Sequence, residues 1–393
     1  MPAPIVLSAE TRRLLELSRS DRDAARAQVD ALPVHQQVAL VCEAPMARRR
    51  ELLDLVSKPE ALVPELPEAE LCYTVKAIGI ADAGWIVEHA ATEQLVACVD
   101  LDAWNDLAPD PSQLGEWIRA AAEAGEDTLL RMAHALDMEL LTLWLAERVE
   151  VTLKTSDDDW EPPAGAITLD GQFYQRARHE KDDLTEVRAL LDVLFRNDYW
   201  HYFRLLQAAQ WEMESDSQEW ALRWRTGRLQ DLGFPTWDES MSVYGVVPER
   251  LLGHLPEPGP DFQMGEWPLP VWIPRLQLSP ERGHAILVAF AELEEHERRG
   301  RLYAFLAVAN QVAVADKLSL GDAESIPAAL EKTARVTSAG LEHLARLHGV
   351  SGAEVVRRTS LEHLFRVGWT LSGERPPFQP HDVDESDDFD PSA

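Results

Sequence analysis

Apolar residues recur along much of the chain with the 3.6-residue period of an α-helix, in short stretches separated by turn residues. A short helix cannot bury its apolar stripe alone, so it must pack against neighbouring helices. The sequence therefore predicts a mainly α fold with little β structure, in which short helices stack on one another. Two successive stripes show the pattern: Leu129, Leu130, Ala133, Leu136, and then Leu140, Leu141, Trp144, Leu145.

Helix boundaries are clearest in the first 153 residues. Asp110 followed by Pro111 is typical of an N-cap with proline at the first helical position, and Gly125 is typical of a helix end. Short helices with such boundaries favour a superhelical, armadillo-like array in this region.

Composition changes along the rest of the chain. Residues 154–182 contain acidic and proline runs and a β-like piece, Ala166–Leu169, which predicts a hairpin; nine of the 25 prolines fall between Pro235 and Pro280. The predicted organisation is a superhelical domain (1–153), a linker with one hairpin (154–182), a helical middle rich in Trp and Arg (183–234), a proline-rich irregular connection (235–279), a C-terminal helical domain (280–375) and an acidic disordered tail (376–393).

The charge balance excludes some classes of partner. The chain has 37 Lys and Arg against 68 Asp and Glu, a formal net charge of -31. Nucleic-acid binding and anionic-membrane binding depend on clustered basic residues, so neither is expected. The longest uncharged run, Leu302–Ala315, has 14 residues, whereas a bilayer span needs about 20. We expect no membrane insertion.

Three cysteines, Cys42, Cys72 and Cys98, have neither the even number of a disulfide framework nor CxxC spacing. They indicate buried thiols in a reducing compartment, and no secretory signal is visible at the N-terminus. Both observations predict a cytoplasmic protein.

Catalytic and cofactor motifs are missing from the sequence. It contains no GxxxxGK[ST], GxGxxG, HExxH or GxSxG pattern. We therefore predict no cofactor and name no catalytic residue, and the sequence favours a non-enzymatic protein over an enzyme.

The densest unusual patch lies in the helical middle. It combines a stripe of tryptophans with three arginines: Trp200, Trp211, Trp220, Trp224, Arg223, Arg225 and Arg228. A tryptophan stripe at helical spacing is more often core than a binding surface, so we expect these indoles to be mostly buried. The arginines are unusual in so acidic a protein. A guanidinium group can stack on an indole ring and form paired hydrogen bonds with a carboxylate. They either cross-link internally to Glu212, Glu214 or Asp231, or bind an anionic ligand or a partner's acidic segment. The candidate ligand or partner residues are Asp198, Trp200, His201, Arg223, Trp224, Arg225 and Arg228.

Three carboxylates, Asp100, Asp102 and Asp106, precede the helix that begins after Asp110. Capping and turn formation explain them in one interpretation. A weak Mg²⁺ or Ca²⁺ site is the alternative, because hard cations prefer oxygen ligands.

Five segments of the chain have a distinctive sequence: Leu66–Gly79, Asp82–Ala83, Asp100–Trp104, Ala221–Pro235 and Glu362–Gly368. Together they resemble a bacterial family known only as domain of unknown function number 6178. Its name implies no activity, so the resemblance transfers no functional residue. Residues 30–150 are also similar to the cytosolic helical superhelix of MgtE-type magnesium transporters, which implies a superhelical fold.

Three functional hypotheses follow. The first is a non-enzymatic cytosolic helical scaffold that binds a protein partner or itself, and the stacked helices and missing catalytic motifs favour it. The second is an enzyme or receptor for an anionic small ligand, with its pocket in the middle Trp/Arg cluster. The third is a divalent-cation-responsive regulator that uses Asp100, Asp102 and Asp106.

Overall fold

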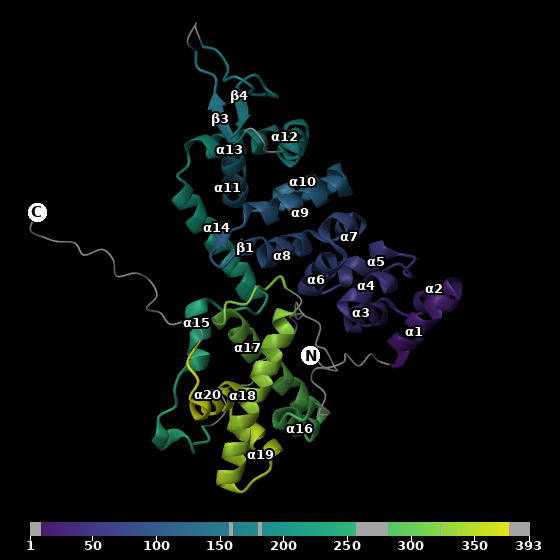
Figure 1. Cartoon of the computed structure of the whole chain (residues 1–393), viewed down its shortest axis with the longest axis vertical. Helices are drawn as coiled ribbons and strands as arrows, with labels where there is room; N and C mark the ends of the chain where they lie inside the picture. The colour runs from purple at the N-terminus through teal and green to yellow at the C-terminus, as the bar shows by residue number, and fades with distance from the viewer. Residues whose placement is uncertain (1–8, 157–159, 180–182, 257–281, 323, 377–393) are drawn as a thin grey trace, which may run out of the picture. The chain divides into compact units, whose positions relative to one another are not determined.

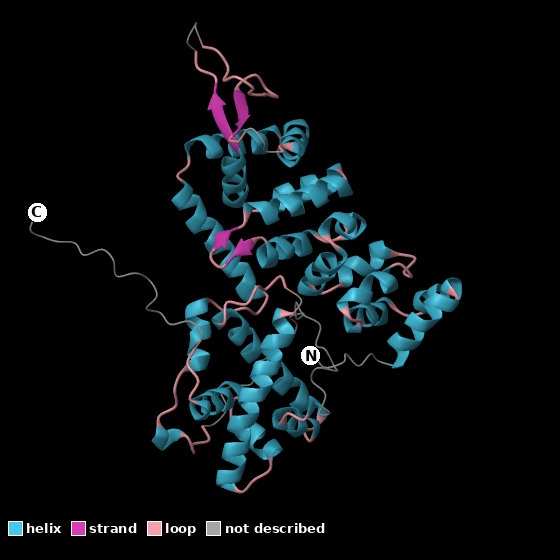
Figure 2. Cartoon of the chain, in the orientation of Figure 1, coloured by secondary structure: helices cyan, strands magenta, loops and turns pink. Residues whose placement is uncertain are grey.

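The computed structural model describes residues 9–156, 160–179, 183–256, 282–322 and 324–376 (Figure 1). These residues are mainly helical, with two short strand pairs (Figure 2), which confirms the predicted fold class. The predicted tail and most of the proline-rich connection, residues 257–279, lie outside the described residues. In the described part of the chain, no helix combines the length and apolar character needed to cross a membrane.

The chain divides into two compact units, one reaching to Leu232 and one beginning at Gly233, except that Gly321 and Asp322 join the first unit. The helices and strands of the first unit are α1 (Ala9–Ser20), α2 (Arg22–Asp30), α3 (Val34–Glu43), α4 (Met46–Leu53), α5 (Pro59–Leu62), η1 (Val63–Glu65), α6 (Glu68–Ile78), η2 (Ile80–Asp82), α7 (Gly84–His89), α8 (Thr92–Asp102), β1 (Trp104–Asn105), β2 (Ala108–Pro109), α9 (Pro111–Ala124), α10 (Glu126–Ala135), α11 (Met138–Arg148), β3 (Val149–Leu153), β4 (Phe173–Ala177), α12 (Thr185–Asn197), α13 (Tyr199–Trp211) and α14 (Glu214–Asp231).

Helices of the first unit pack mainly against the helix two places along the chain. One series of contacts joins α4 to α6, α6 to α8, α8 to α10 and α10 to α12, and another joins α7 to α9, α9 to α11 and α11 to α13. Figure 1 shows the central helices as a stack. The helices inside each series therefore bury their stripes between neighbours on both sides, as the sequence predicts.

Helix α9 begins and ends where the sequence indicates. The Asp110 carboxylate accepts hydrogen bonds from the backbone N–H groups of Ser112 and Gln113, both at 3.0 Å. Pro111 occupies the first helical position, and Gly125 follows the last residue with φ 137°, which only glycine adopts easily. The predicted boundaries of this helix are confirmed.

The hairpin differs from the prediction. Strands β3 and β4 are antiparallel, with Val149 opposite Ala177 and Leu153 opposite Phe173. The predicted piece Ala166–Leu169 supplies only one isolated bridge, between Ile167 and Gln175. Strand β3 directly follows α11, so the hairpin starts before the predicted linker.

A buried ion pair crosses the core of the first unit. Arg49 lies 2.6 Å from a carboxylate oxygen of Glu70, and both side chains are almost completely buried. Arg49 also donates to Thr74 Oγ1 at 2.8 Å and to the carbonyl oxygen of Cys42 at 2.9 Å. These bonds satisfy a charge that would otherwise be costly to bury. The three cysteines are buried and free, as predicted.

The second unit is also helical. Two of its helices start at serine caps, which the Ser351-x-x-Glu354 spacing and the serine at 360 indicate in the sequence. Ser351 accepts from the N–H of Glu354, and Ser360 accepts from the N–H of His363, both at 3.2 Å. Its helices are α15 (Trp237–Met241), η3 (Ser242–Tyr244), η4 (Glu249–Leu251), α16 (Ala285–Ala291), α17 (Glu295–Ala315), α18 (Ser325–His348), α19 (Gly352–Arg358) and α20 (Leu361–Ser372).

Two glycines let α18 and α20 approach closely. A Cβ atom at Gly340 of α18 would overlap the carbonyl oxygen of Leu364, and one at Gly368 of α20 would overlap the carbonyl oxygen of Val336. Both contacts are with backbone, which cannot move aside as a flexible side chain can. Only glycine therefore permits this crossing.

A polar network joins three helical segments of the second unit. Lys332 of α18 donates to Asp316 at 2.7 Å and to the Tyr244 hydroxyl at 2.7 Å, and Tyr244 donates to Asp316 at 2.5 Å. Burial is the main cause that raises the pKa of Tyr244 above its usual range, and the hydrogen bond to Asp316 is the second. Each charge has its partner within the network, which indicates a structural role.

Candidate functional site

Helix α14 carries the predicted arginine cluster, and two of the three arginines point into the protein. Arg228 makes a bidentate contact with Asp100 of α8, with Nε–Oδ2 2.6 Å and Nη2–Oδ1 2.9 Å. It also donates to both oxygens of Asp137, at 2.9 and 2.7 Å. Asp100 is completely buried, so Arg228 neutralises a carboxylate that has no access to solvent.

The electrostatics of Arg228 follow from these contacts. Burial alone would lower its pKa, but the hydrogen bonds to Asp100 and Asp137 outweigh burial and raise the pKa above its usual value. The guanidinium therefore stays charged and holds α14 against the stack. An internal cross-link was one alternative from the sequence, but the expected partners Glu212, Glu214 and Asp231 were wrong.

Arg225 lies beside Arg228 on the same face of α14. Its Nε donates to the carbonyl oxygen of Asp100 at 2.8 Å, and its guanidinium carbon lies 4.7 Å from the centre of the Trp104 ring. Burial lowers the pKa of Arg225 to about 10. The carbonyl and the ring face explain how a partly buried cation is accommodated here.

The structure does not bring Asp100, Asp102 and Asp106 together. Positions 100 and 102 are two apart on α8, so their side chains leave the helix in different directions. Asp102 contacts Lys76, and its other oxygen accepts from Trp117 Nε1 at 3.0 Å. Asp106 lies between β1 and β2 with φ 56°, a turn conformation. The two buried carboxylates thus bind protein donors.

The tryptophans of α14 face outward. The Trp220 and Trp224 side chains are 44% and 48% exposed, with ring centres 6.1 Å apart in a stacked arrangement. The Arg223 guanidinium carbon lies 5.0 Å from the Trp220 ring centre. We call Trp220, Arg223 and Trp224 the α14 tryptophan surface.

Two tryptophans of α13 are still more exposed, Trp200 at 70% and Trp211 at 66%. They are eleven residues apart, which is about three helical turns, so they lie on one side of α13. The expectation that the tryptophan stripe forms core is therefore wrong for these four residues. The inner positions of α14 are taken by Ser217, Ala221 and the paired arginines instead.

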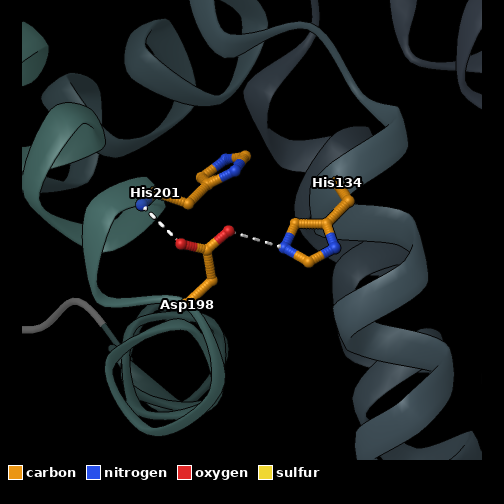
Figure 3. A group of neighbouring side chains, drawn as sticks. All are labelled: His134, Asp198 and His201. Carbon is orange, nitrogen blue, oxygen red and sulfur yellow. Dashed lines mark hydrogen bonds and ion pairs between the residues drawn. The ribbon is translucent and has the colours of Figure 1, made fainter.

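A second group of interest joins α10 and α13. Nε2 of His134 lies 3.2 Å from Oδ2 of Asp198, and the other Asp198 oxygen accepts from the backbone N–H of His201 at 3.1 Å. The two imidazole ring centres are 5.4 Å apart. In Figure 3, one oxygen of the Asp198 carboxylate contacts the His134 ring, and the other contacts the backbone nitrogen of His201.

These three residues are distinctive among the described residues. Only they bring three His, Cys, Asp or Glu ligand atoms within 4.8 Å of one another. Burial, reinforced by the nearby His134, lowers the pKa of His201, and the backbone hydrogen bond from His201 lowers the pKa of Asp198. A neutral imidazole and a charged carboxylate therefore lie side by side near neutral pH.

An apolar pocket of about 360 Å³ lies between the hairpin and α12. Its walls include Val149, Ile167, Leu184 and Leu191. None of the predicted ligand residues lines it, so the pocket and the Trp/Arg cluster are separate features of the first unit.

Sequence reasoning identified Asp198 and His201 but missed His134. The capping position of Asp198 and the i, i+3 spacing of His201 are visible in the sequence. His134 lies on another helix, and nothing in its local sequence indicates that α10 passes beside the start of α13. Asp137, the second partner of Arg228, was missed for the same reason.

Comparisons with known proteins support one of the two resemblances seen in the sequence. The model of a family of unknown function, DUF6178, matches residues 26–374. No curated protein and no solved structure matches the chain, so the likeness to MgtE-type transporters receives no support. Since the match covers most of the sequence, the chain belongs to the DUF6178 family.

Proposed function

We propose that this protein is a non-enzymatic helical scaffold whose α14 tryptophan surface binds a basic, apolar segment of a partner protein. The observation that carries the proposal is the inverted arrangement of α14, where Arg225 and Arg228 face inward and two stacked indoles face solvent. A helix that served packing alone would place its indoles inside.

The energetic argument concerns the exposed half of each indole. A buried tryptophan removes 150–250 Å² from water, so covering the exposed halves of Trp220 and Trp224 would bury roughly 200 Å². At about 25 cal/mol/Å² this contributes about 5 kcal/mol before the costs of association. Trp and Arg are also the residues most enriched in interface hot spots.

Charge selects the kind of partner. The chain carries a net charge of -31, and the first turn of α14 adds Glu214 and Asp216 close to the indoles. Lysine and arginine side chains bind the faces of indole rings as well as carboxylates. Attraction between a basic segment and this acidic protein raises the rate of association.

The other two hypotheses find less support in the site. An anionic ligand needs open guanidinium groups, and Arg225 and Arg228 already bond to protein oxygens. A hard-cation site needs converging carboxylates, and Asp100 and Asp102 bind Arg228 and Lys76 instead.

Position-specific photo-crosslinking tests the proposal. A photoreactive amino acid replaces Trp224 in one variant and Leu347 in another; Leu347 is a matched control because it is also a large apolar residue, 60% exposed, on α18. We expect a protein adduct at position 224 that maps to a basic, apolar segment, and none at 347.

Binding of the mapped segment is then measured as a synthetic peptide. The double substitution Trp220→Ala with Trp224→Ala should weaken binding at least about tenfold, as expected for hot-spot residues. Leu347→Ala should leave it unchanged. Equal adducts at both positions, or a peptide affinity that the double variant keeps, would contradict the proposal. An adduct between two copies of this chain would point to self-association instead.

A further inference from the structure

We propose that His134, Asp198 and His201 form a binding site for a divalent transition-metal ion of the Zn²⁺ class. The site lies apart from the α14 tryptophan surface, and the proposal does not depend on the proposed function. It rests on the geometry, the burial and the ligand chemistry of three side chains.

The geometry requires only a small adjustment. The three ligand atoms lie within 4.8 Å of one another, and Zn–N distances of about 2.0–2.1 Å place tetrahedral ligand atoms about 3.3 Å apart. His134 and Asp198 are partly exposed, at 44% and 37% of their side chains, so their rotamers can close this difference. The least mobile member, His201, is the buried one.

His201 provides the second observation. Its side chain is 7% exposed, and Nε2 is buried without a hydrogen-bond partner among the described residues. Leaving a buried polar nitrogen without a partner is energetically unfavourable. Figure 3 shows both imidazole rings beside the Asp198 carboxylate. A metal ion held by His134 and Asp198 and bound through Nε2 of His201 would satisfy this nitrogen.

The donor set selects the class of metal. Two imidazole nitrogens and one carboxylate suit borderline ions such as Zn²⁺, whereas Mg²⁺ and Ca²⁺ prefer oxygen ligands alone. Three protein ligands also leave a fourth position for water or another molecule.

Two helices hold the ligands in place. Asp198 is the N-cap of α13 and His201 lies in its first turn, so one short stretch of chain positions both. His134 is in the last turn of α10. Helix α12 contacts both α10 and α13, so it fixes the distance between the two helix ends.

Zn²⁺ titration tests the site in the full chain after treatment with a chelator. Binding is measured by competition with a chromophoric chelator in excess Mg²⁺, which occupies loose acidic sites. We expect one tightly bound ion, and substitution with Co²⁺ should give a visible absorption band from nitrogen and oxygen ligands.

Two single substitutions at the proposed ligands make the test specific. Asp198→Asn keeps a capping side chain, since asparagine also caps helices, and His134→Ala changes a half-exposed residue. Each should weaken Zn²⁺ binding at least about tenfold and diminish the Co²⁺ band, while circular dichroism shows an intact fold.

The matched controls remove an exposed histidine and an exposed carboxylate elsewhere in the first unit, His35→Ala and Asp23→Asn. Both should bind Zn²⁺ as the unsubstituted protein does. If Asp198→Asn and His134→Ala also keep full affinity, or if no tight ion binds at all, the proposal is wrong.

Discussion

Helices α14 and α18 belong to different units and solve the problem of packing in opposite ways. Helix α18 presents a continuous stripe of apolar and small residues to its neighbours and buries it. Helix α14 buries little apolar surface, is held by the Arg225 and Arg228 contacts, and leaves Trp220 and Trp224 outside. The buried stripe of α18 includes Ile326, Ala329, Leu330, Thr333, Thr337, Gly340, Leu341 and Leu344.

The two helices are held in place by different kinds of contact, apolar packing for α18 and charged hydrogen bonds for α14. In α18 the sequence pattern and the packing agree. The apolar residues have helical spacing, they are buried, and Gly340 allows close contact with α20. In α14 the largest apolar side chains face solvent, which opposes the tendency to bury them. Such disagreement between sequence pattern and packing is expected where a surface serves another molecule.

Loss of the α14 anchor should give the largest effect. In Arg228→Ala, the completely buried Asp100 loses its bidentate partner, and breaking a buried pair costs about 3–5 kcal/mol. We expect a decrease of this size in the free energy of unfolding, measured by chemical denaturation. Hydrogen exchange should show loss of protection first in α8 and α14. Arg223→Ala, which removes an exposed arginine from the same helix, is the control; an equal loss there would argue against an anchoring role for Arg228.

A substitution at the crossing of α18 and α20 should lower the free energy of unfolding somewhat less than Arg228→Ala does. In Gly340→Ala the new methyl group would meet the backbone of α20, so the two helices must separate; overpacking of this kind costs about 1–3 kcal/mol. Thermal unfolding and exchange protection of α20 measure the effect.

Gly300→Ala on α17 provides the matched substitution, because no atom lies within 4 Å of the added Cβ. There, the better helix propensity of alanine should stabilise the protein by about 0.5–1 kcal/mol. A similar destabilisation at both positions would mean that the close approach at Gly340 does not determine the packing.

The smallest effect on stability is expected at the α14 tryptophan surface. Trp224→Ala removes a half-exposed side chain, and substitutions at such positions usually change the free energy of unfolding by about 0.5 kcal/mol or less. The same variant should weaken partner binding strongly. A loss of several kcal/mol on denaturation would show that the indole is part of the core, and the contrast between α14 and α18 would disappear.

Local signals in the sequence predicted local structure well. Asp110, Pro111 and Gly125 defined α9, and Ser351 and Ser360 defined the starts of α19 and α20, because capping depends on residues within one turn. The hairpin was displaced because strand pairing joins residues far apart in the chain, and the β-like piece Ala166–Leu169 does not reveal its partner.

The candidate sites are formed by contacts between residues that are far apart in the sequence. Arg228 and Asp100 are 128 residues apart, and no periodicity within either helix selects the other as its partner. The tryptophan stripe had the right spacing for a buried face, yet the buried face of α14 was occupied by charged pairs.

The sequence by itself determined that this chain is acidic, mainly helical and built from short stacked helices, because periodicity and capping are properties of neighbouring residues. Only the tertiary structure decided which face of α14 is buried and that His134 meets Asp198 and His201. Those outcomes depend on which helices become neighbours, and that is settled by packing over the whole unit.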